Sequence, residues 1–138
     1  MNLPTYRRIV WSSALYDLLV TLPFATPWTA ALATGQLAGL HRAFGLGGAA
    51  PPEFGPLHLV FVSFFGTIVV LWSVLRLRDP QRLYGLADAL GRVAFSSWMV
   101  FGLVHGETRL VFVFLVPEIA WGLVQLVGWR ASWRDAHR

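Results

Sequence analysis

Residues 57–77 read LHLVFVSFFGTIVVLWSVLRL, an apolar run with no charged side chain before Arg76. A helix that crosses a bilayer needs about 20 apolar residues, and this run has that length. Three further stretches of similar length and character occupy residues 9–32, 83–104 and 110–128. We therefore predict an all-α polytopic membrane protein with four transmembrane helices.

The connections between these stretches predict how the helices are arranged. Residues 78–82 and 105–109 form short links, so the helices that they join must run antiparallel. Within the first stretch, Pro23 and Pro27 each remove a backbone donor, which kinks or breaks a helix. The predicted fold is a single integral-membrane domain over residues 1–138, an antiparallel bundle whose first helix is kinked or broken at these prolines. Residues 28–40 would then form a separate half-helix near the membrane surface.

Composition supports a lipid-embedded chain and excludes several other classes. Hydrophobic residues make up 56% of the chain and charged residues only 13%, whereas soluble domains are about 25% charged. The net charge of +4 does not indicate nucleic-acid binding, because the arginines cluster at the ends of the apolar stretches. The absence of cysteine excludes disulfides and thiolate metal sites. The expected partner is the lipid bilayer, and no nucleic acid is expected.

Arginine placement predicts the orientation of the chain. With the N-terminus inside, the outer ends of the stretches carry only Arg42 and Arg109. Arginine is enriched in cytoplasmic flanks, so both termini should be cytoplasmic, and we expect a bacterial inner-membrane protein. The eight arginines assigned to the inner side are Arg7, Arg8, Arg76, Arg78, Arg82, Arg130, Arg134 and Arg138.

Charged residues inside the apolar stretches identify the candidate site. A charge within a bilayer costs several kcal/mol unless it is paired, hydrated or used in function. Asp88 and Arg92 are four residues apart on one predicted helix, so they should pair with each other. Polar side chains recur at helical spacing on the same faces, and such faces should meet inside the bundle. The candidate ligand- or ion-binding residues are Asp17, Asp88, Arg92, Glu118, Gln125, Ser13 and Thr21.

The charge of this set suggests a function. Three acids and one arginine leave 3 − 1 = 2 surplus negative charges, and Asp17 and Glu118 lack a full partner. We expect one or both acids to be protonated near neutral pH, or a cation to lie between them. The predicted function is binding or transport of a proton, a cation or a small amphipathic ligand. Four short spans enclose little volume, so transport would need a homodimer.

Three other interpretations remain open. The polar set could simply hold the helices together, or the protein could be an accessory subunit of a larger membrane complex. It could also be an intramembrane isomerase-like enzyme acting on an apolar lipid, with one acid donating a proton and another accepting it. No histidine lies at the depth of the serines near the acids, so nucleophilic catalysis is not expected. No cofactor is expected either; the alternative is a haem or a divalent metal held by His58 and His105.

Overall fold

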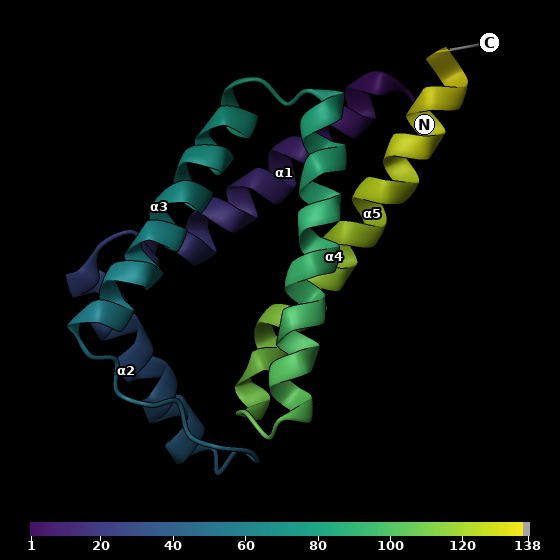
Figure 1. Cartoon of the computed structure of the whole chain (residues 1–138). Helices are drawn as coiled ribbons and strands as arrows, with labels where there is room; N and C mark the ends of the chain where they lie inside the picture. The colour runs from purple at the N-terminus through teal and green to yellow at the C-terminus, as the bar shows by residue number, and fades with distance from the viewer. Residues whose placement is uncertain (137–138) are drawn as a thin grey trace.

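The computed structural model describes residues 1–136, and their side chains as far as residue 132. Within that part of the chain the protein is all-α, as predicted, with five helices, two 3₁₀ turns and no strand (Figure 1). In chain order the elements are α1 (Leu3–Thr21), η1 (Leu22–Phe24), α2 (Pro27–Ala43), α3 (Pro56–Arg78), α4 (Arg82–Val104), η2 (Arg109–Val111) and α5 (Phe112–Ala136).

The helices have the length and apolar character of membrane spans. Within the described residues, three segments qualify singly: Pro56–Arg78, Arg82–Val104 and Arg109–Ser132. Leu3–Phe24 and Pro27–Ala43 qualify only together, as a pair bent by 98°, and they make a fourth span if the two helices cross the bilayer as one. The protein is therefore an integral membrane protein, and the predicted four-span bundle with a broken first span is confirmed.

The break in the first span has a local chemical cause. Pro23 lies in the 3₁₀ turn η1 and Pro27 is the first residue of α2, so neither offers a backbone N–H to a continuous helix. Thr26 has extended backbone and its Oγ1 accepts a hydrogen bond from the amide of Thr29 at 3.3 Å. This is an N-cap, so the chain starts a new helix here instead of continuing α1.

Two helix boundaries differ from the sequence-based expectation. α1 begins at Leu3 instead of residue 9, because Asn2 Oδ1 accepts from the Thr5 amide at 3.0 Å and caps the helix. α5 continues to Ala136, although the apolar stretch ends at Gly128. Apolarity marks the part of a helix that lies in lipid, whereas backbone hydrogen bonding continues into the aqueous interface.

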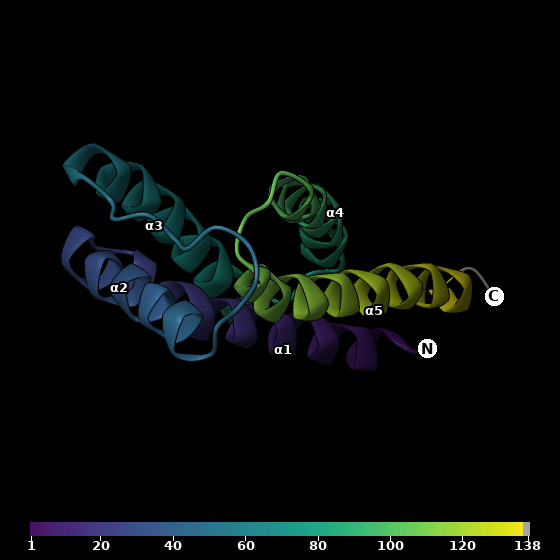
Figure 2. The same cartoon turned by 90° about the horizontal axis from the view of Figure 1, so that it is seen from below.

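α1 crosses the molecule obliquely and packs against α3, α4 and α5 (Figures 1 and 2). Glycines permit the close approaches. A Cβ on Gly85 of α4 would collide with Tyr6 and Val10 of α1, and a Cβ on Gly66 of α3 would collide with the backbone of Phe24. Small residues at helix crossings are typical of packing in membranes.

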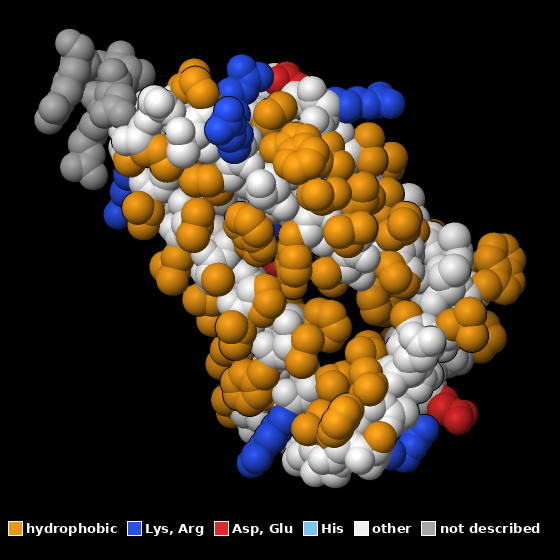
Figure 3. Space-filling view, turned by 180° about the vertical axis from the view of Figure 1, so that it is seen from behind, with side chains coloured by type: hydrophobic (Ala, Val, Ile, Leu, Met, Phe, Trp, Pro, Cys, Tyr) orange, Lys and Arg blue, Asp and Glu red, His pale blue; other side chains and the backbone are white. Residues whose placement is uncertain are grey.

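The two ends of the bundle are built differently. One end of the bundle, here called the termini end, carries both termini and the α3–α4 link (Figure 1). At the opposite end, the loop end, an arm formed by α2 and α3 diverges from an arm formed by α4 and α5 (Figures 1 and 2). On the face shown in Figure 3, hydrophobic side chains cover much of the surface between the two ends, and arginines appear near both. That surface is what a bilayer-spanning protein presents to lipid.

The arms are joined at the loop end by a clasp between residues 44–55 and residues 105–109. The Ala49 amide donates to the Gly106 carbonyl at 2.7 Å, and the Arg109 amide donates to the Gly47 carbonyl at 2.9 Å. Beside them, Nδ1 of His41 and Oγ1 of Thr108 lie 2.7 Å apart. These bonds connect the C-terminal end of α2 to the turn between α4 and α5.

Candidate functional site

Five charged side chains from four helices meet inside the bundle and form what we call the charged cluster. Both arginines are almost completely buried, with exposed side-chain fractions of 0% for Arg76 and 3% for Arg92. A buried charge is tolerated only when partners replace its water, and each of these has at least one partner. The members are Asp17 of α1, Arg76 of α3, Asp88 and Arg92 of α4, and Glu118 of α5.

Arg92 is the centre of the cluster. Its Nη2 lies 2.6 Å from Oδ2 of Asp17, and its Nη1 lies 2.8 Å from Oε2 of Glu118. Its Nε lies 3.0 Å from Oδ2 of Asp88, which is the i,i+4 pair that the sequence predicts. One guanidinium therefore connects α1, α4 and α5 through three different nitrogen atoms.

Arg76 is a second arginine of the cluster that sequence reasoning missed. Its Nη2 lies 2.6 Å from Oδ2 of Asp17 and its Nη1 lies 2.7 Å from Oδ2 of Asp88. The sequence interpretation of Arg76 as a flanking charge on the inner side is therefore wrong. Arg76 lies near the end of α3, where an arginine is expected to flank the membrane. Its long side chain instead reaches inward to the acids. A signal was present in Ser73, three residues earlier on the same helix face, whose Oγ lies 3.5 Å from Arg76 Nη2.

The second arginine changes the charge of the cluster. Two arginines and three acids sum to 2 − 3 = −1, not to the −2 expected from the sequence. Asp17 is shared by both arginines, so the expectation that it lacks a full partner is wrong. Glu118 contacts Arg92 alone among the charged groups of the described residues.

Neutral polar side chains complete the coordination of the cluster. Gln125 Nε2 donates to Asp88 Oδ2 at 2.8 Å and to Ser13 Oγ at 2.7 Å. Gln125 Oε1 accepts from Arg92 Nε at 3.2 Å. Trp72 Nε1 donates to Asp88 Oδ1 at 3.0 Å, a contact that the sequence analysis did not predict. Gln125 and Ser13 thus lie where the sequence analysis expected them, beside the charges.

Thr21 does not reach the charged cluster. Its hydroxyl donates to the backbone carbonyl of Asp17 at 2.6 Å, within the last turn of α1. Helical spacing places Thr21 on the same face as Asp17, but the hydroxyl is used by its own helix.

Three histidines of the described residues, His41, His58 and His105, lie apart from the charged cluster, near the loop end. His58 is exposed beside the ring of Phe54, and His105 is exposed with Nδ1 2.8 Å from the carbonyl of Phe101. Within the described part of the chain, no group of three histidine or acidic side chains is close enough to share a metal ion. The haem or metal alternative at His58 and His105 gains no third ligand from the fold and stays a prediction.

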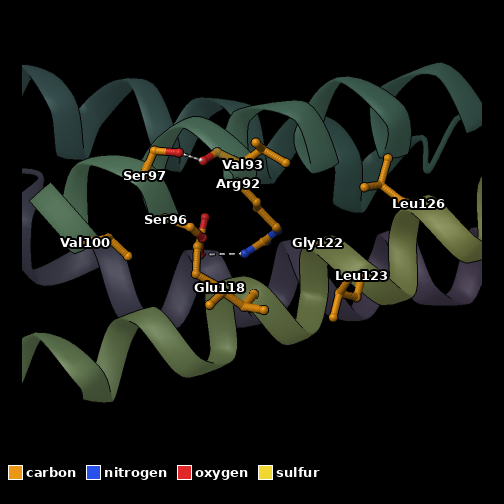
Figure 4. A pocket seen from close by; sticks show the side chains of 10 residues that line it. Arg92, Val93, Ser96, Ser97, Val100, Glu118, Gly122, Leu123 and Leu126 are labelled. Carbon is orange, nitrogen blue, oxygen red and sulfur yellow. Dashed lines mark hydrogen bonds and ion pairs between the residues drawn. The ribbon is translucent and has the colours of Figure 1, made fainter.

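A groove of about 420 Å³ lies between α4 and α5 and reaches the charged cluster (Figure 4). Arg92 and Glu118 point toward each other from the two helices and form its polar part, with Ser96 beside them (Figure 4). At about 1.5 Å per residue, Glu118 lies about 14 Å along its span of Arg109–Ser132, near mid-membrane. The groove-lining residues are Arg92, Val93, Ser96, Ser97, Val100, Glu118, Ile119, Gly122, Leu123 and Leu126.

The groove is accessible from the side of the bundle. Val93, Val100 and Leu123 at its rim are 54%, 45% and 59% exposed, and all three lie within spanning segments. Exposed apolar side chains at this depth face lipid tails. The groove therefore joins the bilayer interior to a buried ion pair.

Comparisons with models of protein families, with curated proteins and with solved structures find no match. The structure shows a helical membrane protein with a buried cluster of arginine, aspartate and glutamate side chains. Function is therefore inferred from the chemistry of the charged cluster and of the groove between α4 and α5 that reaches it.

Proposed function

We propose that the protein binds a small amphipathic ligand, which reaches the groove between α4 and α5 from the lipid. The observation that carries this proposal is the continuity of an apolar rim with the Arg92–Glu118 pair. A volume of about 420 Å³ falls within the range of about 300–1,000 Å³ found for small-molecule sites. Apolar walls with a few convergent polar groups are also typical of such sites.

The contacts of the three acids support a division of roles within the cluster. Asp17 and Asp88 each contact both arginines, so they hold the helices together. Among the charged groups that the structure describes, Glu118 contacts only Arg92, and it lines the groove. An acid needed only for helix packing would be expected among the doubly paired ones. Glu118 is therefore the group that we assign to ligand binding, with Arg92 holding it in place.

We also propose that the termini end faces the cytoplasm of a bacterial cell. The described arginine side chains other than Arg76 and Arg92 support this orientation, since only Arg42 and Arg109 belong to the loop end. Arg76 was counted among the arginines of the inner side, and without it the termini end still carries more arginines than the loop end. The side chain of Arg134 and all of Arg138 lie outside the described residues.

Native mass spectrometry of the protein extracted gently from its own membrane tests the proposal. We expect a small amphiphile as a mass adduct, and the same spectrum reports whether the expected homodimer forms. Ser96→Leu, which fills the groove beside Glu118 without changing charge, should remove the adduct. Leu90→Phe is the matched control, because Leu90 is an exposed α4 residue outside the groove.

Other results would contradict ligand binding. Recovery only with other polypeptides, and without an adduct, would favour the accessory-subunit alternative. Conversion of an added apolar lipid, abolished by Asp17→Asn, would favour the isomerase-like alternative. An adduct that persists in Ser96→Leu would place the ligand elsewhere on the protein.

A further inference from the structure

The charge of the cluster restricts which ligand the groove can accept. With every group ionised, two arginines and three acids sum to 2 − 3 = −1. Net charge near mid-membrane is costly because lipid cannot solvate it. A ligand with one positive charge brings the sum to zero, whereas an anionic ligand brings it to −2.

Every side-chain nitrogen of Arg92 already contacts an acid. Each of the three lies within 3.0 Å of a carboxylate oxygen, so an anionic headgroup bound to Arg92 would have to lie beside Asp17, Asp88 or Glu118. Like charges held together in low dielectric repel each other strongly. Arg92 is therefore not placed to recognise a phosphate or a carboxylate in the groove.

The Glu118 carboxylate in the groove has a hydrogen-bond acceptor that is not used. Glu118 uses Oε2 to accept from Arg92 Nη1 at 2.8 Å, and within the described residues no side chain or backbone donor contacts its Oε1. An unpaired carboxylate oxygen in low dielectric favours a charged hydrogen-bond donor, since such bonds are about twice as strong as neutral ones. Within the described residues no donor contacts Asp17 Oδ1 either, but of these two acids only Glu118 lines the groove.

We propose that the ligand is a hydrophobic amine, bound as its ammonium ion with an N–H group donating to Glu118. Its hydrocarbon part lies along the apolar rim formed by Val93, Val100 and Leu123. This inference rests on the proposed function and names the ligand class of the same groove. An alkyl ammonium is charged at neutral pH, as lysine is, so the amine already carries its positive charge when it binds.

Photo-crosslinking in lipid nanodiscs tests the ligand class. Three probes share a twelve-carbon chain with a terminal diazirine and differ only in the polar group, which is an amine, an alcohol or a carboxylate. We expect the amine probe to label α4 and α5 at the groove, with at least about tenfold higher yield than the carboxylate probe. A charge-assisted hydrogen bond is worth about tenfold or more in affinity.

Matched variants separate charge from shape. Glu118→Gln should reduce amine labelling by about tenfold, and Glu118→Asp should restore part of it. Ser96→Leu should abolish labelling with the charges intact. Glu107→Gln removes an exposed acid from the turn after α4, outside the groove, and should have no effect.

The outcomes distinguish the two proposals. If the alcohol or carboxylate probe labels the groove as well as the amine does, and Glu118→Gln changes nothing, the ligand class is wrong but the groove still binds amphiphiles. If all probes label the lipid-facing helices evenly and Ser96→Leu has no effect, the groove binds nothing and both proposals fall.

Discussion

The charged cluster and the loop end of the bundle are held together by different forces. Around the charged cluster, side chains from α1, α3, α4 and α5 form five ion pairs of 3.0 Å or less. At the loop end the two arms diverge, and the clasp joins them mainly through backbone hydrogen bonds and the His41–Thr108 contact (Figure 1). Ion pairs therefore fix the helix packing around the charged cluster, whereas contacts of a loop join the helices at the loop end.

The difference matters because a buried ion cannot tolerate the loss of its partners. Removing one member of a buried pair exposes the other to low dielectric, so the charged cluster permits few alternative packings. Backbone bonds at an interface can exchange with water at small net cost. We therefore expect the cluster to define the helix arrangement, while the loop end can move without breaking it.

The largest expected effect comes from removing the centre of the cluster. Arg92→Met leaves Asp17, Asp88 and Glu118 with one fewer partner each, and should lower the free energy of unfolding by about 3–5 kcal/mol or prevent folding. Reversible unfolding in mixed micelles measures the change. Arg109→Met, an exposed arginine at the loop end, is the control and should stay within about 0.5 kcal/mol. Equal losses in both variants would show that the cluster is not the main constraint.

A smaller loss is expected where α1 and α4 approach closely at the termini end. Gly85→Leu places a side chain against Tyr6 and Val10 and should cost about 3 kcal/mol by overpacking. Gly91→Ala is the matched control on the same helix, since a Cβ there meets nothing within 4 Å. It should be neutral, or stabilising by up to about 1 kcal/mol through helix propensity. Thermal unfolding of both variants in one detergent would refute the packing argument if their midpoints agree.

At the loop end, Gly48→Ala should release the clasp while leaving the charged cluster intact. Gly48 has φ +91°, and a Cβ there would collide with the Glu107 backbone, so the substitution should cost about 2 kcal/mol. Hydrogen exchange of the Ala49 and Arg109 amides should accelerate, with amides near Arg92 unchanged. Gly55→Ala serves as the control, because Gly55 has φ −67° and room for a methyl group. Faster exchange near Arg92 as well would show that the two ends are coupled.

The smallest effect concerns a single side chain of the clasp. Thr108 Oγ1 accepts from the Leu110 amide at 3.1 Å and lies 2.7 Å from His41 Nδ1. Thr108→Val preserves shape and removes both contacts, so we expect a loss of about 1 kcal/mol. In a double-mutant cycle with His41→Leu, the two losses should not add. Additive losses would mean that the His41–Thr108 contact contributes nothing.

Sequence reasoning succeeded where a feature depends on neighbouring residues in the chain. The four apolar stretches, the break at Pro23 and Pro27, and the Asp88–Arg92 pair all follow from local spacing. It failed for Arg76, which was interpreted as a flanking charge, and it did not predict the contact of Trp72 with Asp88. Trp72 and Arg76 lie near the C-terminal end of α3, and only the oblique crossing of α1 brings Asp17 within 2.6 Å of Arg76.

The sequence by itself determined that the chain crosses a membrane and where its first span breaks. Lipid solvates no backbone group, so long apolar stretches must become helices whatever surrounds them, and proline interrupts a helix through its own ring. Tertiary structure decided which charges pair, that the cluster carries −1 and not −2, and that Glu118 faces a groove. Those outcomes depend on how helices cross, and crossings are set by contacts such as Gly85 with Tyr6 between residues far apart in the chain.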